Sequence, residues 1–299
     1  MTLAVRWVVT LNFLFSAVGL IDNALADGAV PSGKLSDKST YTLFHPVPDD
    51  QQRDLNPDRP SRFTSPTTVD AGHYLLETDV VNYTQDRHNP ERERADVDQW
   101  NFPQPELRIG LTEHTEIDFL YEGYLNRRTR EPDQRRVRFQ SGSGDLLIQG
   151  KYNLFGNDTG DVAFGILPYI KLPTNTAHLG NGFVEGGLEF PLSINLPGNF
   201  SLGLETEFDA LRNDADTRHV AGFTNTAFLG YNFLGKKLQI YGEWFSRVTA
   251  GPGSRLDGEV DTGLVYFVGK NAEVDFGCNF GVTRAAPDFE PFIGFSKRF

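Results

Sequence analysis

The chain ends in an alternating segment, residues 289–299, whose last residue is aromatic. Successive side chains of a β-strand point to opposite faces, so Ile293, Phe295 and Phe299 share one face of this segment. The other face carries polar or small residues, namely Glu290, Gly294, Ser296 and Arg298. A strand that is apolar on one side, polar on the other, and ends on Phe is typical of the last strand of a transmembrane β-barrel, with a lipid face and a lumen face.

The N-terminus predicts export. Arg6 supplies a positive charge, residues 7–21 are mostly apolar, and Ala24-Leu25-Ala26 forms a small-x-small cleavage site. A membrane-anchoring helix is the competing interpretation, but the apolar stretch is shorter than the roughly 20 residues that span a bilayer. We expect residues 1–26 to be a signal peptide that is cleaved after Ala26.

Composition restricts how the mature chain can cross a membrane. Mean hydropathy is −0.37, and no second apolar run reaches the length of a membrane helix. Only a closed β-barrel then satisfies every backbone polar group in lipid. The sequence therefore predicts an all-β fold, a transmembrane antiparallel barrel of about 12 strands.

Charge and cysteine content exclude other classes. The signal peptide removes one acid and one base from 40 acidic and 28 basic residues, so the net charge stays at −12. Nucleic acid is an unsuitable partner for such a chain. The single cysteine, Cys278, excludes an internal disulfide and any two-cysteine metal or redox motif, and we expect it on the lipid face.

Period-2 alternation and turn residues locate the strands. The predicted ranges are 73–84, 98–111, 116–125, 144–155, 162–172, 184–196, 200–210, 219–233, 238–246, 259–268, 273–283 and 289–299. Tight connections rich in Gly, Asn and Asp at 112–115, 156–161, 197–199, 234–237 and 269–272 alternate with longer charged ones. Outer-membrane barrels have this alternation of short periplasmic turns and long outer loops.

Individual strands differ in clarity. In 200–210 the carboxylates Glu205, Glu207 and Asp209 share one face, which cannot contact lipid. A soluble β-sandwich with one wet face would also alternate, but the export signal and the terminal Phe favour the barrel. In 219–233 both faces mix apolar and polar residues, so the register of that strand stays open.

Two segments fall outside the predicted strands of the barrel, residues 73–299. Residues 27–72 are rich in Pro, Asp, Ser and Thr and lack periodicity, so they form either an irregular periplasmic lead-in or a plug in the lumen. Residues 126–143 form a predicted outer loop with six arginines. That loop is either simply solvated or attracts anions such as lipopolysaccharide phosphates.

Several short motifs point to a family. They include Asp58-Arg59-Pro60, the run from Ser65 to Glu77, Pro105 to Thr112, Gly144-Asp145-Leu146, and Leu172-Pro173-Thr174. The chain resembles, over most of its mature length, the MetA-pathway phenol-degradation family of outer-membrane proteins. The resemblance implies a transporter-like barrel, and it implies no catalytic residues.

The predicted lumen is charged and predominantly acidic. Fifteen inward carboxylates face only four inward bases, Arg108, Lys151, Lys171 and Arg298. The lumen-lining candidates are Glu106, Arg108, Lys151, Lys171, Glu189, Glu205, Glu207 and Glu243. Such a lining predicts a channel for passive or gated passage of small organic solutes, hydrophobic or aromatic ones among them. A structural or assembly barrel with a closed interior is the alternative.

Catalysis is not indicated. The six histidines lack the context of an outer-membrane phospholipase, and a rim hydrolase built on Asp209, Asp214, Asp216 and His219 is the weaker hypothesis. We expect no catalytic, metal or cofactor site. The expected partners are outer-membrane lipid, a small-molecule solute, and the barrel assembly machinery, which would bind the C-terminal strand. The expected location is the bacterial outer membrane.

Overall fold

A computed structural model describes residues 37–132, 136–180, 182–212, 218–251 and 254–299. The predicted signal peptide, residues 1–26, lies outside these ranges. The strands are β1 (Tyr74–Asp86), β2 (Asp96–Phe102), β3 (Gln104–Gly110), β4 (Thr115–Tyr121), β5 (Tyr124–Arg130), β6 (Val137–Ser143), β7 (Leu146–Phe155), β8 (Val162–Leu172), β9 (Glu185–Leu196), β10 (Phe200–Arg212), β11 (His219–Phe233), β12 (Leu238–Thr249), β13 (Asp257–Phe267), β14 (Ala272–Gly281) and β15 (Phe289–Arg298). One short 3-10 helix, η1 (Pro90–Arg92), follows β1. None of the described helical segments is long and apolar enough to cross a membrane.

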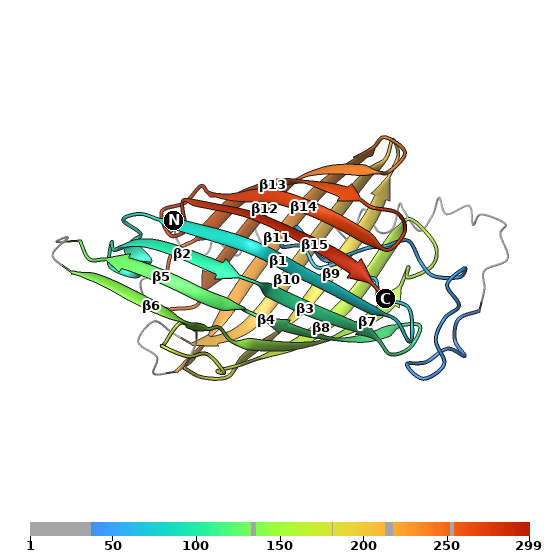
Figure 1. The fold of residues 1–299 in the computed structure, drawn as a ribbon, viewed down its shortest axis with the longest axis horizontal. Coiled ribbons are helices and arrows are strands. Elements are labelled where there is room, and N and C mark those ends of the chain that lie inside the picture. The colour runs from blue at the N-terminus through green and yellow to red at the C-terminus, as the bar shows by residue number, and fades with distance from the viewer. Residues whose placement is uncertain (1–36, 133–135, 181, 213–217, 252–253) are drawn as a thin grey trace.

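The strands form one antiparallel sheet that closes on itself. Its order is β15-β14-β13-β12-β11-β10-β9-β8-β7-β4-β3-β1-β2-β5-β6, and β15 also pairs with β1, where Leu75 lies opposite Arg298. β2 with β3, β4 with β5, and β6 with β7 are each one long barrel strand with an interruption. The fifteen segments therefore make the predicted twelve-stranded barrel (Figure 1).

The interruptions have local causes. Pro103 separates β2 from β3 and has no N–H to offer the ladder. Gly123 separates β4 from β5 with φ of +70°, and a Cβ there would lie 1.9 Å from the carbonyl oxygen of Pro103. Only glycine accommodates both the left-handed backbone and this close approach.

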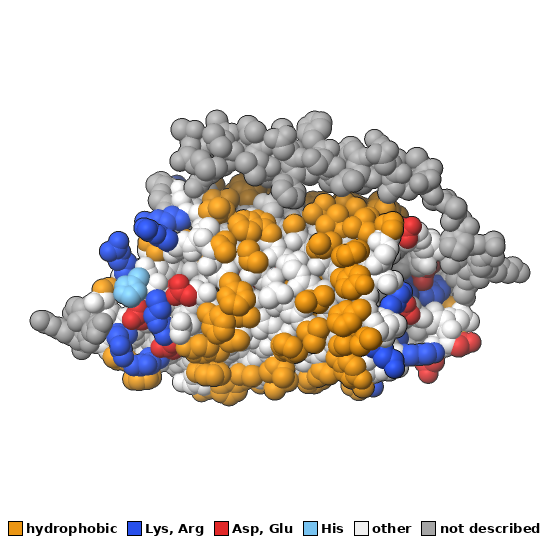
Figure 2. Space-filling view, turned by 90° about the horizontal axis from the view of Figure 1, so that it is seen from above, with side chains coloured by type: hydrophobic (Ala, Val, Ile, Leu, Met, Phe, Trp, Pro, Cys, Tyr) orange, Lys and Arg blue, Asp and Glu red, His pale blue; other side chains and the backbone are white. Residues whose placement is uncertain are grey.

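Side chains divide cleanly between the two faces of the barrel wall. On β14, Val274 and Phe276 are 44% and 57% exposed, whereas Glu273 and Asp275 are each 2% exposed. On the face seen in Figure 2, the outward residues form an apolar band, with charged side chains gathered at its two ends. A polar interior inside an apolar band of this kind is the pattern of a transmembrane β-barrel.

Connection length distinguishes the two ends of the barrel. Turns of a few residues join β3 to β4, β7 to β8, β9 to β10, β11 to β12 and β13 to β14 at what we call the short-turn end. The chain leaves the barrel at the same end, where the backbone N–H of Tyr74 donates to the carbonyl of Phe299. The other end, with the longer connections, is the long-loop end.

Two sequence expectations are refined by the strands. The predicted arginine-rich loop at 126–143 is wrong, because β5 runs to Arg130 and β6 begins at Val137, so a hairpin extends the wall. Its polar side chains hid it from a search for apolar alternation, because a strand that extends into the headgroup region needs a paired backbone but no apolar face. The uncertain strand 219–233 is β11, paired along its length, with Thr224, Thr226 and Phe228 buried on the lumen side.

Candidate functional site in the lumen

Residues 56–68, here called the inner segment, contact inward side chains from strands all around the barrel. The guanidinium of Arg59 lies 2.7 Å from Asp275 on β14, and the N–H of Thr64 donates to Glu205 on β10 at 3.0 Å. The carbonyl of Pro66 accepts from Asn153 on β7 at 2.9 Å. Among residues 37–73, the described backbone forms no strand or helix, only one isolated bridge between Thr42 and His45.

A buried charge cluster anchors the inner segment on one side of the lumen. Arg108 on β3 lies 2.9 Å from Glu77 on β1 and 2.8 Å from Glu116 on β4. Lys151 on β7 lies 3.0 Å from the same Glu116, and all four side chains are at most 2% exposed. Asp58 of the inner segment joins them, with one oxygen 2.9 Å from Lys151 and 3.1 Å from Arg108. Three carboxylates thus surround two cations, which we call the Arg108 cluster.

Two arginines of the inner segment bind carboxylates on β1, β13, β14 and β15. Arg59 pairs with Asp79 on β1 as well as with Asp275. Arg62 lies 2.6 Å from Glu259 and 3.3 Å from Asp261, both on β13, and 3.0 Å from Glu290 on β15. These arginines balance part of the excess of inward carboxylates that the strands themselves leave unpaired.

An aromatic contact joins the inner segment to β11 and β12. The ring of Phe63 lies 5.9 Å from that of Phe228, which lies 5.5 Å from that of Tyr241. Gly203 on β10 makes room for it, because a Cβ there would lie 2.7 Å from the Phe63 ring. The lumen therefore offers an apolar aromatic surface beside charged groups.

A second group of carboxylates lies on β9 and β10, and we call it the β9–β10 acidic group: Glu189, Glu205, Glu207 and Asp209. Their hydrogen bonds come from uncharged donors, such as Gln149 to Glu189 at 2.8 Å and the Tyr169 hydroxyl to Asp209 at 2.7 Å. Within the described part of the chain, no Lys or Arg forms an ion pair with these four side chains. One oxygen of Glu189 is buried with no hydrogen-bond partner there.

The predicted lumen candidates fall into four places. Arg108 and Lys151 share the Arg108 cluster, and Glu106 lies beside it, opposite Glu77 in the ladder. Glu189, Glu205 and Glu207 are in the β9–β10 acidic group, with Glu189 opposite Glu207. Glu243 accepts from the backbone N–H groups of Arg62 and Phe63 at 2.8 and 3.1 Å. Lys171 stands apart toward the long-loop end, paired with Glu122 and 4.0 Å from Asp145.

Sequence reasoning missed the residues of the inner segment that contact these candidates. Asp58, Arg59, Arg62 and Phe63 lie in a stretch without periodicity, which the sequence left open between a periplasmic lead-in and a lumen plug, and none of the four was among the lumen candidates. One signal was available, because fifteen inward carboxylates against four inward bases require cations from outside the strands.

The other predicted features lie as follows. Ile293 and Phe299 are 48% and 65% exposed on the outward face of β15, and Phe295 shares that face. Two residues of the hydrolase hypothesis have other partners in the structure. Asp209 accepts a hydrogen bond from the Tyr169 hydroxyl, and a ring nitrogen of His219 lies 2.8 Å from the carbonyl oxygen of Val184. Asp214 and Asp216 lie outside the described residues. Among the described residues, no group of three or more His, Cys, Asp or Glu could hold a metal ion.

The closed twelve-stranded wall, the apolar outer band and the charged interior define the class as a bacterial outer-membrane β-barrel. The chain belongs to the family "Putative MetA-pathway of phenol degradation", whose pattern it matches over residues 57–299. No curated protein sequence matches it.

Among solved structures, the chain is similar to the COG4313 outer membrane channel from Pseudomonas putida F1. The two are 11% identical with a TM-score of 0.60 over 82% of this chain and 100% of that one. The NanC porin gives 9% identity and a TM-score of 0.49 over 74% of this chain and 98% of that one. At these identities, the likeness is one of fold.

Proposed function

We propose that the chain forms a gated passage through the outer membrane for small organic solutes, with the inner segment as its constriction. The observation that carries the proposal is the polar attachment of that segment. Ion pairs and hydrogen bonds hold residues 58–64 to the wall, and such contacts can be exchanged for water. A segment bound in this way can shift without unfolding the barrel.

The lining suggests which solutes could pass. The β9–β10 acidic group has no cation within ion-pair distance among the described residues, so it favours cations or solutes that donate hydrogen bonds. The rings of Phe63, Phe228 and Tyr241 offer a surface for a hydrophobic or aromatic part of the solute. Small amphiphilic organic molecules combine both properties.

Orientation follows from the two ends of the barrel. Short turns face the periplasm in outer-membrane barrels, and this chain begins and ends its barrel at the short-turn end. We therefore place the start of the inner segment on the periplasmic side. The signal peptide would deliver the chain to the periplasm, and the assembly machinery would then recognise its C-terminal strand.

The alternative is a structural barrel with a closed interior. The Arg108 cluster favours it, because Arg108, Glu77, Glu116 and Lys151 are all buried and mutually paired. A lumen that is filled by such pairs throughout would pass nothing.

Single-channel conductance in a planar bilayer under a salt gradient separates the two. The mature chain, a variant lacking residues 27–71, and R59Q/R62Q would be refolded, and folding confirmed by heat-modifiable gel mobility. We expect discrete steps for the mature chain, a cation-favouring reversal potential, and larger steps for both variants. Folded but silent protein in all three cases would contradict the passage and favour the closed barrel.

A further inference from the structure

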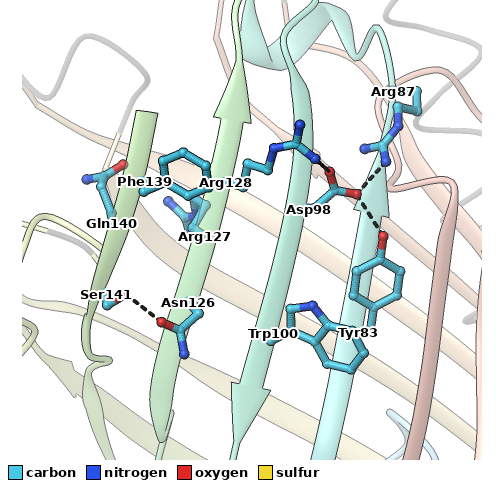
Figure 3. A pocket seen from close by; sticks show the side chains of 10 residues that line it. All are labelled: Tyr83, Arg87, Asp98, Trp100, Asn126, Arg127, Arg128, Phe139, Gln140 and Ser141. Carbon is cyan, nitrogen blue, oxygen red and sulfur yellow. Dashed lines mark hydrogen bonds and ion pairs between the residues drawn. The ribbon is translucent and has the colours of Figure 1, made fainter. Parts of the chain in front are cut away.

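The outward face of the wall near the long-loop end carries a groove that the passage does not use. It has a volume of about 540 Å³ (Figure 3). Its lining comes from β1, β2, β5, β6 and the start of the β1–β2 connection: Tyr83, Arg87, Asp98, Trp100, Asn126, Arg127, Arg128, Phe139, Gln140 and Ser141.

The main side chains of this groove point away from the lumen. Trp100 pairs with Asn126 across β2 and β5, and both lie on the same face as Phe102 and Tyr124, which are 40% and 46% exposed. The opposite face of the same strands is buried, as Leu125 at 4% exposure shows. The groove therefore faces the surroundings of the barrel at membrane level.

Residue type changes with height along these strands. Phe102 and Tyr124 come first, with ring centroids 6.3 Å apart. The pair Trp100 and Asn126 follows two residues further toward the long-loop end, and Asp98 with Arg128 follows after two more. Each step of two residues is about 7 Å along a strand. Apolar rings, then an amphipathic indole, then charge is the order expected across the boundary between acyl chains and headgroups.

The charged part of the groove is preorganised around one carboxylate. Asp98 pairs with Arg87, accepts from the Tyr83 hydroxyl at 2.7 Å, and lies 3.7 Å from Arg128 (Figure 3). Two guanidinium groups against one carboxylate leave one positive charge. The Arg128 side chain is 42% exposed and, within the described residues, donates no hydrogen bond, so its N–H groups are available to a ligand.

We propose that this groove binds a phosphorylated lipid of the outer leaflet. Arg128 contacts the headgroup phosphate, since guanidinium binds phosphate through paired N–H donors. Arg87 donates to Asp98 and to the carbonyls of Asp86 and Val97, so it adds positive charge beside the phosphate without a paired contact of its own.

Trp100 packs against the upper acyl chains, and Asn126 and Ser141, which lie at the same level of the ladder, supply polar contacts to the rest of the headgroup. Phe139 lies opposite Arg128 and packs against the lipid beside the phosphate. Phe139 is 74% exposed, which is understandable for a ring that contacts lipid.

The proposal is tested with the full mature chain in nanodiscs of phosphatidylcholine containing diphosphorylated lipid A. Lipid A that stays bound after transfer to detergent is measured by native mass spectrometry for the wild type, R87Q/R128Q and R138Q. Arg138 lies opposite Thr129 on the other face of the same hairpin, so R138Q removes a neighbouring positive charge without touching the groove. We expect retention to fall about thirtyfold in R87Q/R128Q, from roughly 1 kcal/mol per arginine, and to stay unchanged in R138Q.

Three outcomes would overturn the proposal. One is equal retention of lipid A by R87Q/R128Q and the wild type, both folded by gel mobility. Another is equal retention by the wild type of lipid A stripped of its phosphates. The third is displacement of lipid A by millimolar inorganic phosphate, which would make the groove a site for a free anion. Retention that needs both arginines and the phosphates of the lipid supports it.

Discussion

The two sides of the lumen use buried carboxylates differently. In the Arg108 cluster, Glu77, Glu116 and Asp58 surround Arg108 and Lys151 at 2.8 to 3.1 Å. In the β9–β10 acidic group, Glu205 accepts from a backbone N–H and Asp209 from a tyrosine hydroxyl. Paired buried charges fix geometry, whereas carboxylates without cations attract water or a mobile cation.

The Arg108 cluster and the β9–β10 acidic group have separate tasks. The Arg108 cluster joins four strands to the inner segment, so it acts as a structural anchor. In the passage that we propose, the β9–β10 acidic group lines the part where a solute or ion replaces water. Substitutions on the two sides should therefore change different properties, stability on one and selectivity on the other.

The largest effect is expected from R108Q. Losing the guanidinium leaves Glu77, Glu116 and Asp58 with Lys151 alone, and an uncompensated buried charge costs about 3–5 kcal/mol. We expect a lower urea midpoint of unfolding, read from the heat-modifiable gel shift. R138Q, on the exposed hairpin, serves as the control and should shift the free energy of unfolding by less than about 0.5 kcal/mol. Equal midpoints for R108Q and R138Q would remove the anchor role of the cluster.

This division also marks where sequence reasoning succeeded. The strands followed from period-2 alternation, since lipid and lumen impose opposite preferences on neighbouring residues, as in Glu273 to Phe276. The lumen candidates followed from the same alternation. Their partners did not, because Asp58, Arg59 and Arg62 reach the lumen through tertiary ion pairs that leave no periodic trace. The hairpin of β5 and β6 was missed for the converse reason, because in the headgroup region neither face must be apolar.

A smaller effect, confined to selectivity, is expected from E205Q/E207Q. The amide oxygen introduced at position 205 would still accept from the N–H of Thr64, so the free energy of unfolding should change little. Each lost charge near a hydrated pathway is worth about 1 kcal/mol, so losing both should lower the cation-to-anion permeability ratio roughly thirtyfold. Reversal potentials under a salt gradient measure this ratio.

The matched control is E131Q, which removes an exposed carboxylate from the connection between β5 and β6. Its ratio should stay at the wild-type value. If E131Q lowers the ratio as much as E205Q/E207Q, selectivity comes from the overall negative charge of the barrel, and the comparison between the two sides fails.

The smallest effect concerns Asp158, in the turn between β7 and β8 at the short-turn end. It lies 2.7 Å from Lys38 and 2.7 Å from Arg53, which tie the chain before the inner segment to the wall. Burial raises the pKa of Asp158, but hydrogen bonds from Arg53 and Lys38 lower it by more, so the pKa lies below its ordinary value of 3.8. The carboxylate is 22% exposed, so the contact contributes no more than about 1 kcal/mol.

The sign of the pH dependence follows from this lowered pKa. A depressed folded-state pKa stabilises the folded form above the unfolded pKa, and this stabilisation is lost as the pH falls through the folded value. Between pH 8 and 5, amide exchange around Arg53 should therefore stay constant after correction for intrinsic rates, and it should rise below about pH 4. D158N should show the raised exchange at pH 7 already and respond no further to acid. If wild-type exchange around Arg53 rises between pH 8 and 5, a group other than Asp158 holds this part of the chain to the wall.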